Sequence, residues 1–399
     1  MTASLSVLIK KREKTAVLIL AVVLSLLIFG NGLGGDFVFD DAAVVKNRGD
    51  LKDSSYFLNL FVSPYHQNMP KTGLYRPFTM ASYAINHYIN SSVNPEQTSA
   101  FGFHLVNVLI HAFNSFLVFW LVSYFLKSRY IALSSFLLFL THPLHTEAVT
   151  SIVGRAELLA FLWSILTIYF FVKNYKLLAA VSFLLALWSK ETALMVLPIL
   201  FYLTIYFENK SFWESVRRLL FLAIPTGIYA VFRYITLGQY FFGDATTTIV
   251  ENQLKFVSFF ERTFTALKVL AMYAERLIWP FNLSADYSYQ RIAIVGNIFK
   301  SPEALSGLIL LGGLLWLAIK YRHNDTTKFS LGAGAVLFLF PYLMISNLIL
   351  PVGTIMGERL MYFPSLGFVV LLAWLLQQLF QSSRFNLGTL KRLNLGIFG

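Results

Sequence analysis

The amino-acid sequence predicts an all-α polytopic membrane protein, and three observations lead to this prediction. Hydrophobic residues make up 57% of the 399 residues and charged residues only 13%, whereas a soluble domain usually carries about 25% charged residues. The apolar residues gather in runs close to the length that crosses a bilayer. There is no cysteine, which excludes a disulfide framework and a thiolate metal site.

Ten apolar segments are expected to cross the membrane as helices. The first is a retained anchor and not a cleavable signal peptide, because the run from Gly32 to Gly35 leads straight into Asp36 without a small-residue cleavage site. A further stretch, 263–279, contains several charged residues and is expected to lie on the outer surface as an amphipathic helix. The ten segments are 15–31, 104–126, 130–141, 157–172, 177–189, 192–207, 219–237, 304–319, 329–350 and 360–380.

The basic residues predict the orientation of the chain. They cluster in alternate loops, which all fall on one side if the N-terminus is cytoplasmic. That side then carries 17 Lys and Arg against 4 Asp and Glu, whereas the other side carries 15 against 16. The net charge of +12 is therefore a topology signal and not the footprint of a nucleic-acid partner.

We interpret residues 1–381 as one transmembrane domain with two large outer loops, 32–103 and 238–303. Both loops interleave aromatic with polar residues, which favours helices lying at the membrane interface. Residues 382–399 are expected to form a short basic cytoplasmic tail, in which no 34-residue helical repeat is found.

Unusual polar residues come from several loops and helix ends, yet the predicted topology places them all on the outer side. A transporter would bury such groups near the bilayer midplane, so this distribution favours an active site at the outer membrane boundary. The candidates are the carboxylates Asp40 and Asp41, the cations Arg76, Arg155, Lys190 and Arg359, and the supporting residues His142, His145, Glu147, Glu157, Glu191 and Glu358.

These residue types restrict the chemistry. The sequence has no Gly-x-Ser-x-Gly elbow and no Walker loop, so a serine nucleophile and nucleotide hydrolysis lack their parts. Several cations that converge beside a bilayer suggest a phosphate carrying a lipid tail, because arginine binds phosphate through a bidentate fork. A carboxylate base facing a phosphate-activated carbon suggests transfer of a group to a hydroxyl acceptor.

Seven motifs in collinear order carry a family resemblance. They are Phe37–Asp41, Tyr75–Pro77, Phe103–His111, His142–Val149, Val153–Glu157, Ser189–Glu191 and the stretch from Ser346-Asn347 to Gly357–Ser365. Together they resemble the membrane half of the transmembrane and tetratricopeptide-repeat-containing O-mannosyltransferases, members of the GT-C superfamily of glycosyltransferases.

The resemblance implies a GT-C bundle of about 10–11 transmembrane helices with amphipathic helices in large extracytoplasmic loops. It also implies inverting transfer of a sugar, mannose favoured, from a dolichyl- or undecaprenyl-phosphate donor to a hydroxyl acceptor such as a protein Ser or Thr. In this family pattern Asp40 is the catalytic base, and Asp41 orients the base or the acceptor.

Several candidates also fit plainer roles. Asp41 is a favoured residue type for capping the helix that follows. His104 and His111 lie seven residues apart on one helix face and are expected to hydrogen-bond between helices. Arg155 with Glu157, and Lys190 with Glu191, have the spacing of helix-end ion pairs, and Glu191 is expected to hold Lys190 in position.

A metal site is not demanded by the sequence. His142, His145 and Glu147 superficially suggest zinc ligands, but Pro143 breaks a regular helix there and no second cluster completes the set. No cofactor is required, and a divalent cation held by Asp41 and His145 stays an open alternative.

Two other functions also stay open: a transporter or flippase for a lipid-linked sugar, and a non-catalytic membrane scaffold. For localisation we expect an integral membrane protein with a cytoplasmic N-terminus and an extracytoplasmic site. A prokaryotic plasma membrane is favoured by the absence of repeats from the tail, and the endoplasmic reticulum is expected if the host is eukaryotic.

Overall fold

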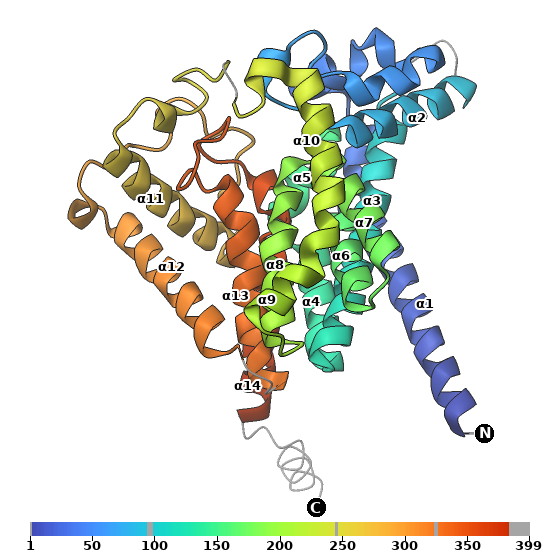
Figure 1. Cartoon of the computed structure of the whole chain (residues 1–399), viewed down its shortest axis with the longest axis vertical. Coiled ribbons are helices and arrows are strands. Elements are labelled where there is room, and N and C mark those ends of the chain that lie inside the picture. The colour runs from blue at the N-terminus through green and yellow to red at the C-terminus, as the bar shows by residue number, and fades with distance from the viewer. Residues whose placement is uncertain (1, 94–98, 244–245, 323–325, 383–399) are drawn as a thin grey trace, which may run out of the picture.

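A computed structural model describes residues 2–93, 99–243, 246–322 and 326–382, and their regular secondary structure is entirely helical (Figure 1). Each of the ten predicted segments corresponds to a helix. These helices are α1 (Thr2–Phe29), α3 (Phe101–Leu126), α4 (Arg129–Thr141), α6 (Arg155–Val172), α7 (Lys176–Ser189), α8 (Val196–Tyr206), α10 (Ala223–Leu237), α12 (Pro302–Lys320), α13 (Thr326–Ile345) and α14 (Ser365–Ser382). The tail prediction concerns mainly 383–399, which lie outside the described residues.

Five helical stretches of the described residues are long and apolar enough to cross a bilayer alone. They include most of α1 and all of α3, α6, α10 and α12. The remaining five predicted segments form shorter apolar helices that pack within the bundle. The prediction of an all-α polytopic membrane protein is therefore confirmed.

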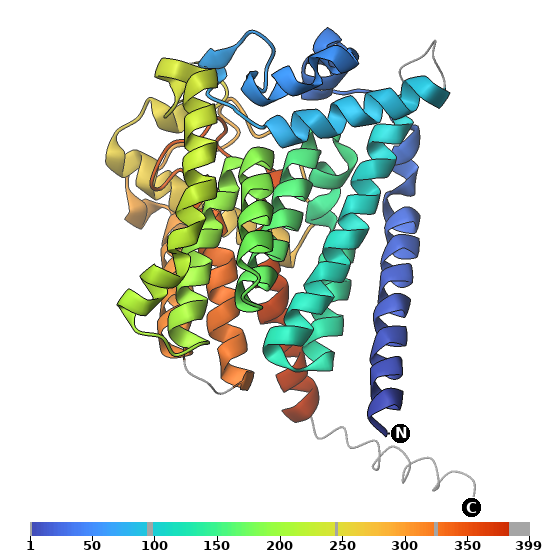
Figure 2. The ribbon, with the colours of Figure 1, turned by 45° about the vertical axis from the view of Figure 1, so that its right-hand side comes forward.

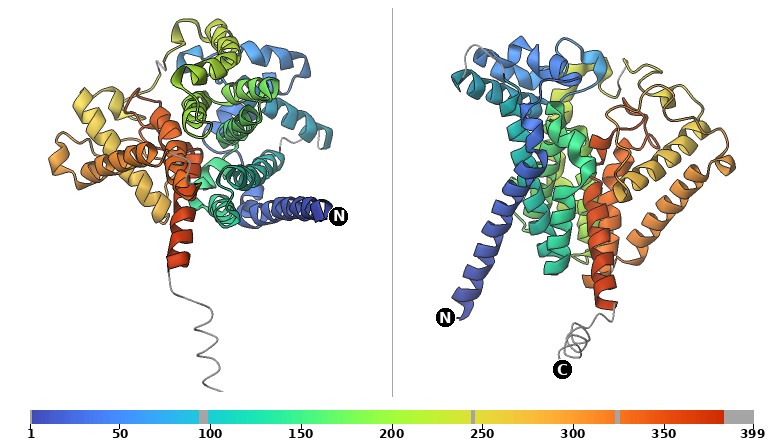
Figure 3. Two further views of the ribbon diagram at one scale, coloured as in Figure 1. Left: turned by 60° about the horizontal axis from the view of Figure 1, so that its bottom comes forward. Right: turned by 180° about the vertical axis from the view of Figure 1, so that it is seen from behind.

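Burial separates central from peripheral helices. In the most apolar windows of α3 and α6, 61% and 72% of the residues are buried, against 17–22% in the stretches that contain α1, α10 and α12. Figure 3 shows α1 at the edge of the bundle, where it packs mainly against α3. The peripheral helices thus present apolar side chains outward, as lipid-facing helices do.

The helices α13 and α14 approach each other closely because both carry glycine at the contact. A Cβ atom placed on Gly367 would lie 2.3 Å from the carbonyl oxygen of Gly334 and equally near the backbone N of Phe338. Small residues permit such close backbone packing between membrane helices.

Both predicted outer loops contain helical segments. The first loop holds the short turns η2 (Ala42–Lys46), η3 (Gly49–Leu51), η4 (Ser54–Val62) and η5 (Pro70–Thr72), followed by α2 (Pro77–Val93). These segments cover the end of the bundle opposite to the N-terminus (Figure 2). Their buried residues form a core of their own with the start of α3.

The second loop contains α11 (Phe259–Ile278), which includes most of the stretch expected to be an amphipathic surface helix. A capping box of Ser258 and Glu261 starts this helix. One face of α11 buries Leu270 and Tyr273 against α12 and α13. The helix is therefore packed on one side, and its position at the outer membrane surface stays a prediction.

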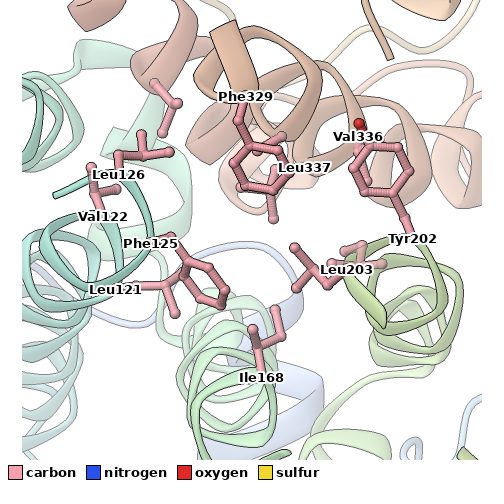
Figure 4. Close-up of a pocket in the computed structure, with 13 residues that line it drawn as sticks. Leu121, Val122, Phe125, Leu126, Ile168, Tyr202, Leu203, Phe329, Val336 and Leu337 are labelled. Atoms are coloured by element: carbon pink, nitrogen blue, oxygen red, sulfur yellow. The ribbon is translucent and has the colours of Figure 1, made fainter. Parts of the chain in front are cut away.

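An apolar cavity of about 30 Å³ lies between α3, α6, α8, α13 and α14 (Figure 4). Tyr202 contributes the polar atom of its lining, and this hydroxyl donates to the carbonyl of Ala318 at 3.0 Å. Leu126, at the end of α3, and Phe329, near the start of α13, mark its position at the end of the bundle away from the outer loops. The cavity is therefore separate from the polar residues predicted to form the site.

Candidate active site

The two adjacent carboxylates sit on a tight turn that points them in different directions. The N–H of Asp41 donates to the carbonyl of Val38 at 2.9 Å, and Phe39 adopts a left-handed backbone with φ of 46°. The side chain of Asp41 is completely buried, whereas that of Asp40 is 58% exposed. Asp40 alone of the pair is accessible to a substrate.

Asp41 anchors the turn to a distant segment of the chain. Its Oδ1 accepts the N–H of Val153 at 2.8 Å, and its Oδ2 accepts those of Ile152 at 3.4 Å and Val38 at 3.3 Å. Burial raises the pKa of Asp41, and these N–H donors act in the opposite direction. Asp41 makes no side-chain cap to the helical turn that follows, so its role is to hold Asp40 and not to cap a helix.

Arg359 lies between two carboxylates. Its Nη2 is 3.8 Å from Oδ2 of Asp40, and its Nε is 3.5 Å from Oε1 of Glu147. The backbone N–H of Arg359 also donates to Oε2 of Glu147 at 2.8 Å. Both side-chain pairs are long for charge-assisted hydrogen bonds and Arg359 is 34% exposed, which leaves its guanidinium able to bind a further anion.

Glu147 supports Arg359 from the short helix α5 (Thr146–Thr150). Its side chain is 16% exposed. Burial raises the pKa of Glu147, and the charge of Arg359 partly offsets this effect. The Glu147 carboxylate therefore holds Arg359 in position by accepting its backbone N–H and by pairing with its guanidinium.

Two of the other three predicted cations form ion pairs. Arg76, directly before α2, donates to Glu191 through two parallel hydrogen bonds of 3.1 and 2.7 Å. Lys190 forms an ion pair with Glu157, and the two side chains are only 7% and 6% exposed. The expected pairing of Glu191 with Lys190 is wrong. Lys190 has extended backbone, with φ of −161°, so the side chains of these neighbours diverge.

Arg155 has a structural environment. It is completely buried, and its guanidinium donates to Asn107 Oδ1, Asn86 Oδ1 and the carbonyls of Ser82 and Phe103 at 2.8–3.2 Å. The guanidinium thus joins α2, α3 and α6. Contact with a donor phosphate would require it to leave these partners, so Arg155 is the least accessible of the four predicted cations.

The histidines mainly hold the fold together. His142 accepts the N–H of Leu144 at 3.2 Å and contacts the carbonyl of Leu277 at 2.9 Å. His145 bonds Ser365 Oγ at 2.8 Å. Within the described ranges no group of three or more potential ligand side chains could hold a metal ion.

The prediction that His104 and His111 on α3 hydrogen-bond between helices is confirmed for His111 alone. His111 bonds Tyr362 Oη at 2.8 Å and the Leu140 carbonyl at 3.1 Å, so it links helices as expected. His104 is buried beside Gly35, and neither of its ring nitrogens has a hydrogen-bond partner in the part of the chain that the structure describes. His104 therefore does not form the predicted interhelical bond.

Glu358 links the site to the second outer loop. Its Oε1 accepts the N–H of Ser284 at 2.6 Å and the hydroxyl of Tyr287 at 2.7 Å. Because Arg359 follows directly, the same short segment holds both the loop and the accessible cation.

Tyr65 belongs to this site although its sequence context gave no sign of it. Its ring lies under Arg76, with Cζ 5.0 Å from the ring centroid. The Tyr65 phenol also interacts electrostatically with Asp40, Asp41, Arg76 and Arg359. One tyrosine within an aromatic-rich loop carries no sequence signal, because only the folded loop brings it under the arginine.

The structure thus brings eight of the predicted residues into one cluster at the end of the bundle that the loop segments cover. They are Asp40, Asp41, Arg76, Glu147, Glu157, Lys190, Glu191 and Arg359. Arg155, His142, His145 and Glu358 brace the surrounding segments. Chemically the cluster offers an exposed carboxylate beside a loosely paired arginine.

Comparison with known proteins finds relatives of this chain. It is 30% identical over 375 residues to protein O-mannosyl-transferase F38B6.6 of Caenorhabditis elegans, covering 91% of this chain and 51% of that protein. It is 27% identical to TMTC4 of Mus musculus and 26% identical to TMTC3 of Homo sapiens, covering 88% and 86% of this chain and 54% and 40% of those proteins.

The chain spans about half the length of the curated relatives it matches. No family model and no solved structure matches it. The family resemblance carried by the seven motifs is nevertheless confirmed: over about nine-tenths of its length this chain is a relative of the TMTC proteins.

Proposed function

We propose that this protein is an inverting glycosyltransferase of the membrane, which moves a sugar from a polyprenyl-phosphate donor to a hydroxyl acceptor on the extracytoplasmic side. The observation that carries the proposal is the exposed carboxylate of Asp40 held 3.8 Å from the loosely paired guanidinium of Arg359. The relatives are named protein O-mannosyl-transferases, which favours mannose as the sugar and a protein Ser or Thr as the acceptor.

In this mechanism Asp40 acts as general base. Its carboxylate accepts the proton of the acceptor hydroxyl while that oxygen attacks the anomeric carbon on the face opposite to the phosphate. The new glycosidic bond forms as the bond from the anomeric carbon to the phosphate oxygen breaks, so the configuration inverts. Polyprenyl phosphate departs with the bonding electrons, and Arg359 stabilises its negative charge.

The other residues of the cluster support these two. Asp41 holds the turn of Asp40, and Glu147 holds Arg359. Arg76 and Lys190 add positive potential from their pairs with Glu191 and Glu157. The mechanism requires no metal ion, because the guanidinium takes the charge of the leaving group.

A transporter or flippase is favoured less. The eight-residue cluster lies at one end of the bundle, whereas a transporter places its charged groups near the midplane. The proposed site faces the outside of the plasma membrane in a prokaryote and the lumen of the endoplasmic reticulum in a eukaryote. The three relatives compared above come from animals, so the comparisons add no support for a prokaryotic host.

The test compares the wild type with Asp40→Asn in proteoliposomes that contain radiolabelled polyprenyl-phosphate mannose or glucose and a Ser/Thr peptide. A matched control is Asp36→Asn, since Asp36 is exposed in the same loop and pairs only weakly with Lys46, at 3.8 Å. We expect Asp40→Asn to lose turnover by a factor of at least about 100 while it still binds donor, and Asp36→Asn to keep it. Equal turnover of wild type and Asp40→Asn would remove Asp40 from the mechanism, and a silent wild type with every donor would favour the scaffold.

A further inference from the structure

Phe39 combines two unfavourable features next to the proposed base. Its φ of 46° lies in the left-handed region, which bulky residues rarely adopt and which glycine or asparagine adopts far more easily. Its side chain is also 82% exposed. A strained backbone costs stability, and an exposed side chain makes few contacts that could offset this cost. Strained residues of this kind concentrate at functional sites.

The turn itself does not need an aromatic side chain. It is closed by the bond of 2.9 Å from the N–H of Asp41 to the Val38 carbonyl, and by Oδ2 of Asp41, which accepts the Val38 N–H. All of these groups would remain if residue 39 were glycine. Phe37, two residues earlier, supplies the aromatic packing of this segment, because it is buried with its ring centroid 5.7 Å from that of Phe103.

The loop that carries Phe39 also exposes charged side chains. Asp36 and Lys46, from the same loop, have side chains that are 77% and 46% exposed. On the phosphate side of Asp40 stands Arg359, 3.8 Å from its Oδ2. A general base must come within about 2.6–3.2 Å of the oxygen that it deprotonates. Phe39 directly precedes Asp40 and its side chain is exposed, so an acceptor bound at Asp40 comes within reach of Phe39.

We propose that Phe39 is an acceptor-binding residue: its ring packs against an apolar side chain of the polypeptide, next to the Ser or Thr whose hydroxyl Asp40 deprotonates. This inference rests on the function proposed above. An aromatic ring suits the task because it offers a large contact area with few rotatable bonds. The occupant is an extended segment of protein carrying an apolar residue near its hydroxyl, and not the phosphate-bearing donor.

The experiment measures transfer to a Ser/Thr peptide by the full chain in proteoliposomes, with the KM for peptide and for donor determined separately. Phe39→Gly removes the ring and relieves the strained φ. We expect its KM for the peptide to rise about tenfold, as for loss of a central contact, with the donor KM within twofold of wild type. Phe39→Tyr keeps the ring, and its peptide KM should stay within threefold of wild type.

Phe242→Gly serves as the matched control, because Phe242 is 95% exposed in the second outer loop and has no place in the proposed site. The thermal midpoint of Phe39→Gly should equal or exceed that of wild type, which separates lost binding from lost folding. An unchanged peptide KM in Phe39→Gly, or an equal rise in the donor KM, would overturn the proposal.

The two proposals fail in different ways. If transfer depends on Asp40 while Phe39→Gly keeps its peptide KM, the glycosyltransferase stands and the acceptor contact does not. If the wild type transfers no sugar, binding of fluorescent peptide to wild type and Phe39→Gly, measured by anisotropy, decides whether Phe39 binds a polypeptide. Loss of peptide binding in the variant would then support the contact, and equal binding would refute it.

Discussion

We predict how much the ion pair of Lys190 and Glu157 contributes to the free energy of unfolding. Glu157→Gln keeps the size of the side chain and removes its charge, so the ammonium of Lys190 loses its counter-ion at a site where it is only 7% exposed. Removal of one partner from a buried pair costs about 3–5 kcal/mol of unfolding free energy. Attraction to Glu191 remains, so we expect the low end, about 3 kcal/mol, or a shift of roughly 100-fold in the unfolding equilibrium constant.

The assay is equilibrium unfolding in mixed micelles, in which SDS is titrated and helix content is followed by circular dichroism. Glu208→Gln is the matched control, because Glu208 pairs with Arg218 at 2.8 Å but the two side chains are 15% and 27% exposed. That change should cost less than about 1 kcal/mol. The double variant Glu157→Gln/Lys190→Met, which removes both charges, should regain most of the loss.

The same prediction has a pH dependence of known sign. Burial lowers the pKa of Lys190, and the charge of Glu157 opposes this effect, so Glu157→Gln should lower that pKa further. A lysine with a lowered folded-state pKa destabilises the fold when it is charged. The deficit of Glu157→Gln should therefore be full below the lowered pKa and shrink as pH rises toward 10.5. A variant that unfolds within about 0.5 kcal/mol of wild type at pH 7 would refute the reasoning.

Three further predictions concern other contacts. If the proposed reaction is right, Arg359→Gln removes the cation beside its leaving phosphate and should lower kcat by about 100-fold. Steady-state kinetics that show unchanged kcat would assign the charge stabilisation to another residue. Burial raises the pKa of Glu147 above 4.5. Wild type should therefore lose stability relative to Glu147→Gln as pH rises from 4.5 through that raised pKa. SDS unfolding at several pH values measures this difference, and a gain in wild-type stability over that range contradicts the prediction. Gly367→Ala places a methyl group 2.3 Å from the Gly334 carbonyl and should cost about 1–3 kcal/mol by overpacking; a thermal midpoint in detergent equal to that of wild type argues against the close α13–α14 contact.

Sequence patterns anticipated the elements of this fold but not how they pair. All ten apolar segments became helices, since hydrophobic runs and Pro or Gly breaks act over a few residues of chain. Grouping of the polar residues at one end was also foreseeable, because alternating spans place alternate loops on the same side. The partners were not foreseeable: Glu191 was expected to hold Lys190, yet it binds Arg76, which lies 115 residues away in the chain.

The sequence also could not predict which individual charged side chains are buried. Asp40 and Asp41 are adjacent and chemically identical, but one is exposed and the other accepts N–H groups from residues 152 and 153. Arg155 belongs to a motif of the family resemblance, yet it is closed in by two asparagines and two carbonyls. Accessibility depends on which segments pack over a residue, and no short-range pattern encodes that.

By itself the sequence determined the all-α membrane class, the ten helical segments, the family relationship and the grouping of polar residues at one end of the bundle. Hydropathy, charge alternation and motif order are properties of the chain read in one dimension, so they need no folded structure. Only the tertiary structure decided that Asp40 and Arg359 are accessible and lie 3.8 Å apart, and that the ring of Tyr65 lies under Arg76. These arrangements come from contacts between segments far apart in the chain, and the packing of the bundle creates them.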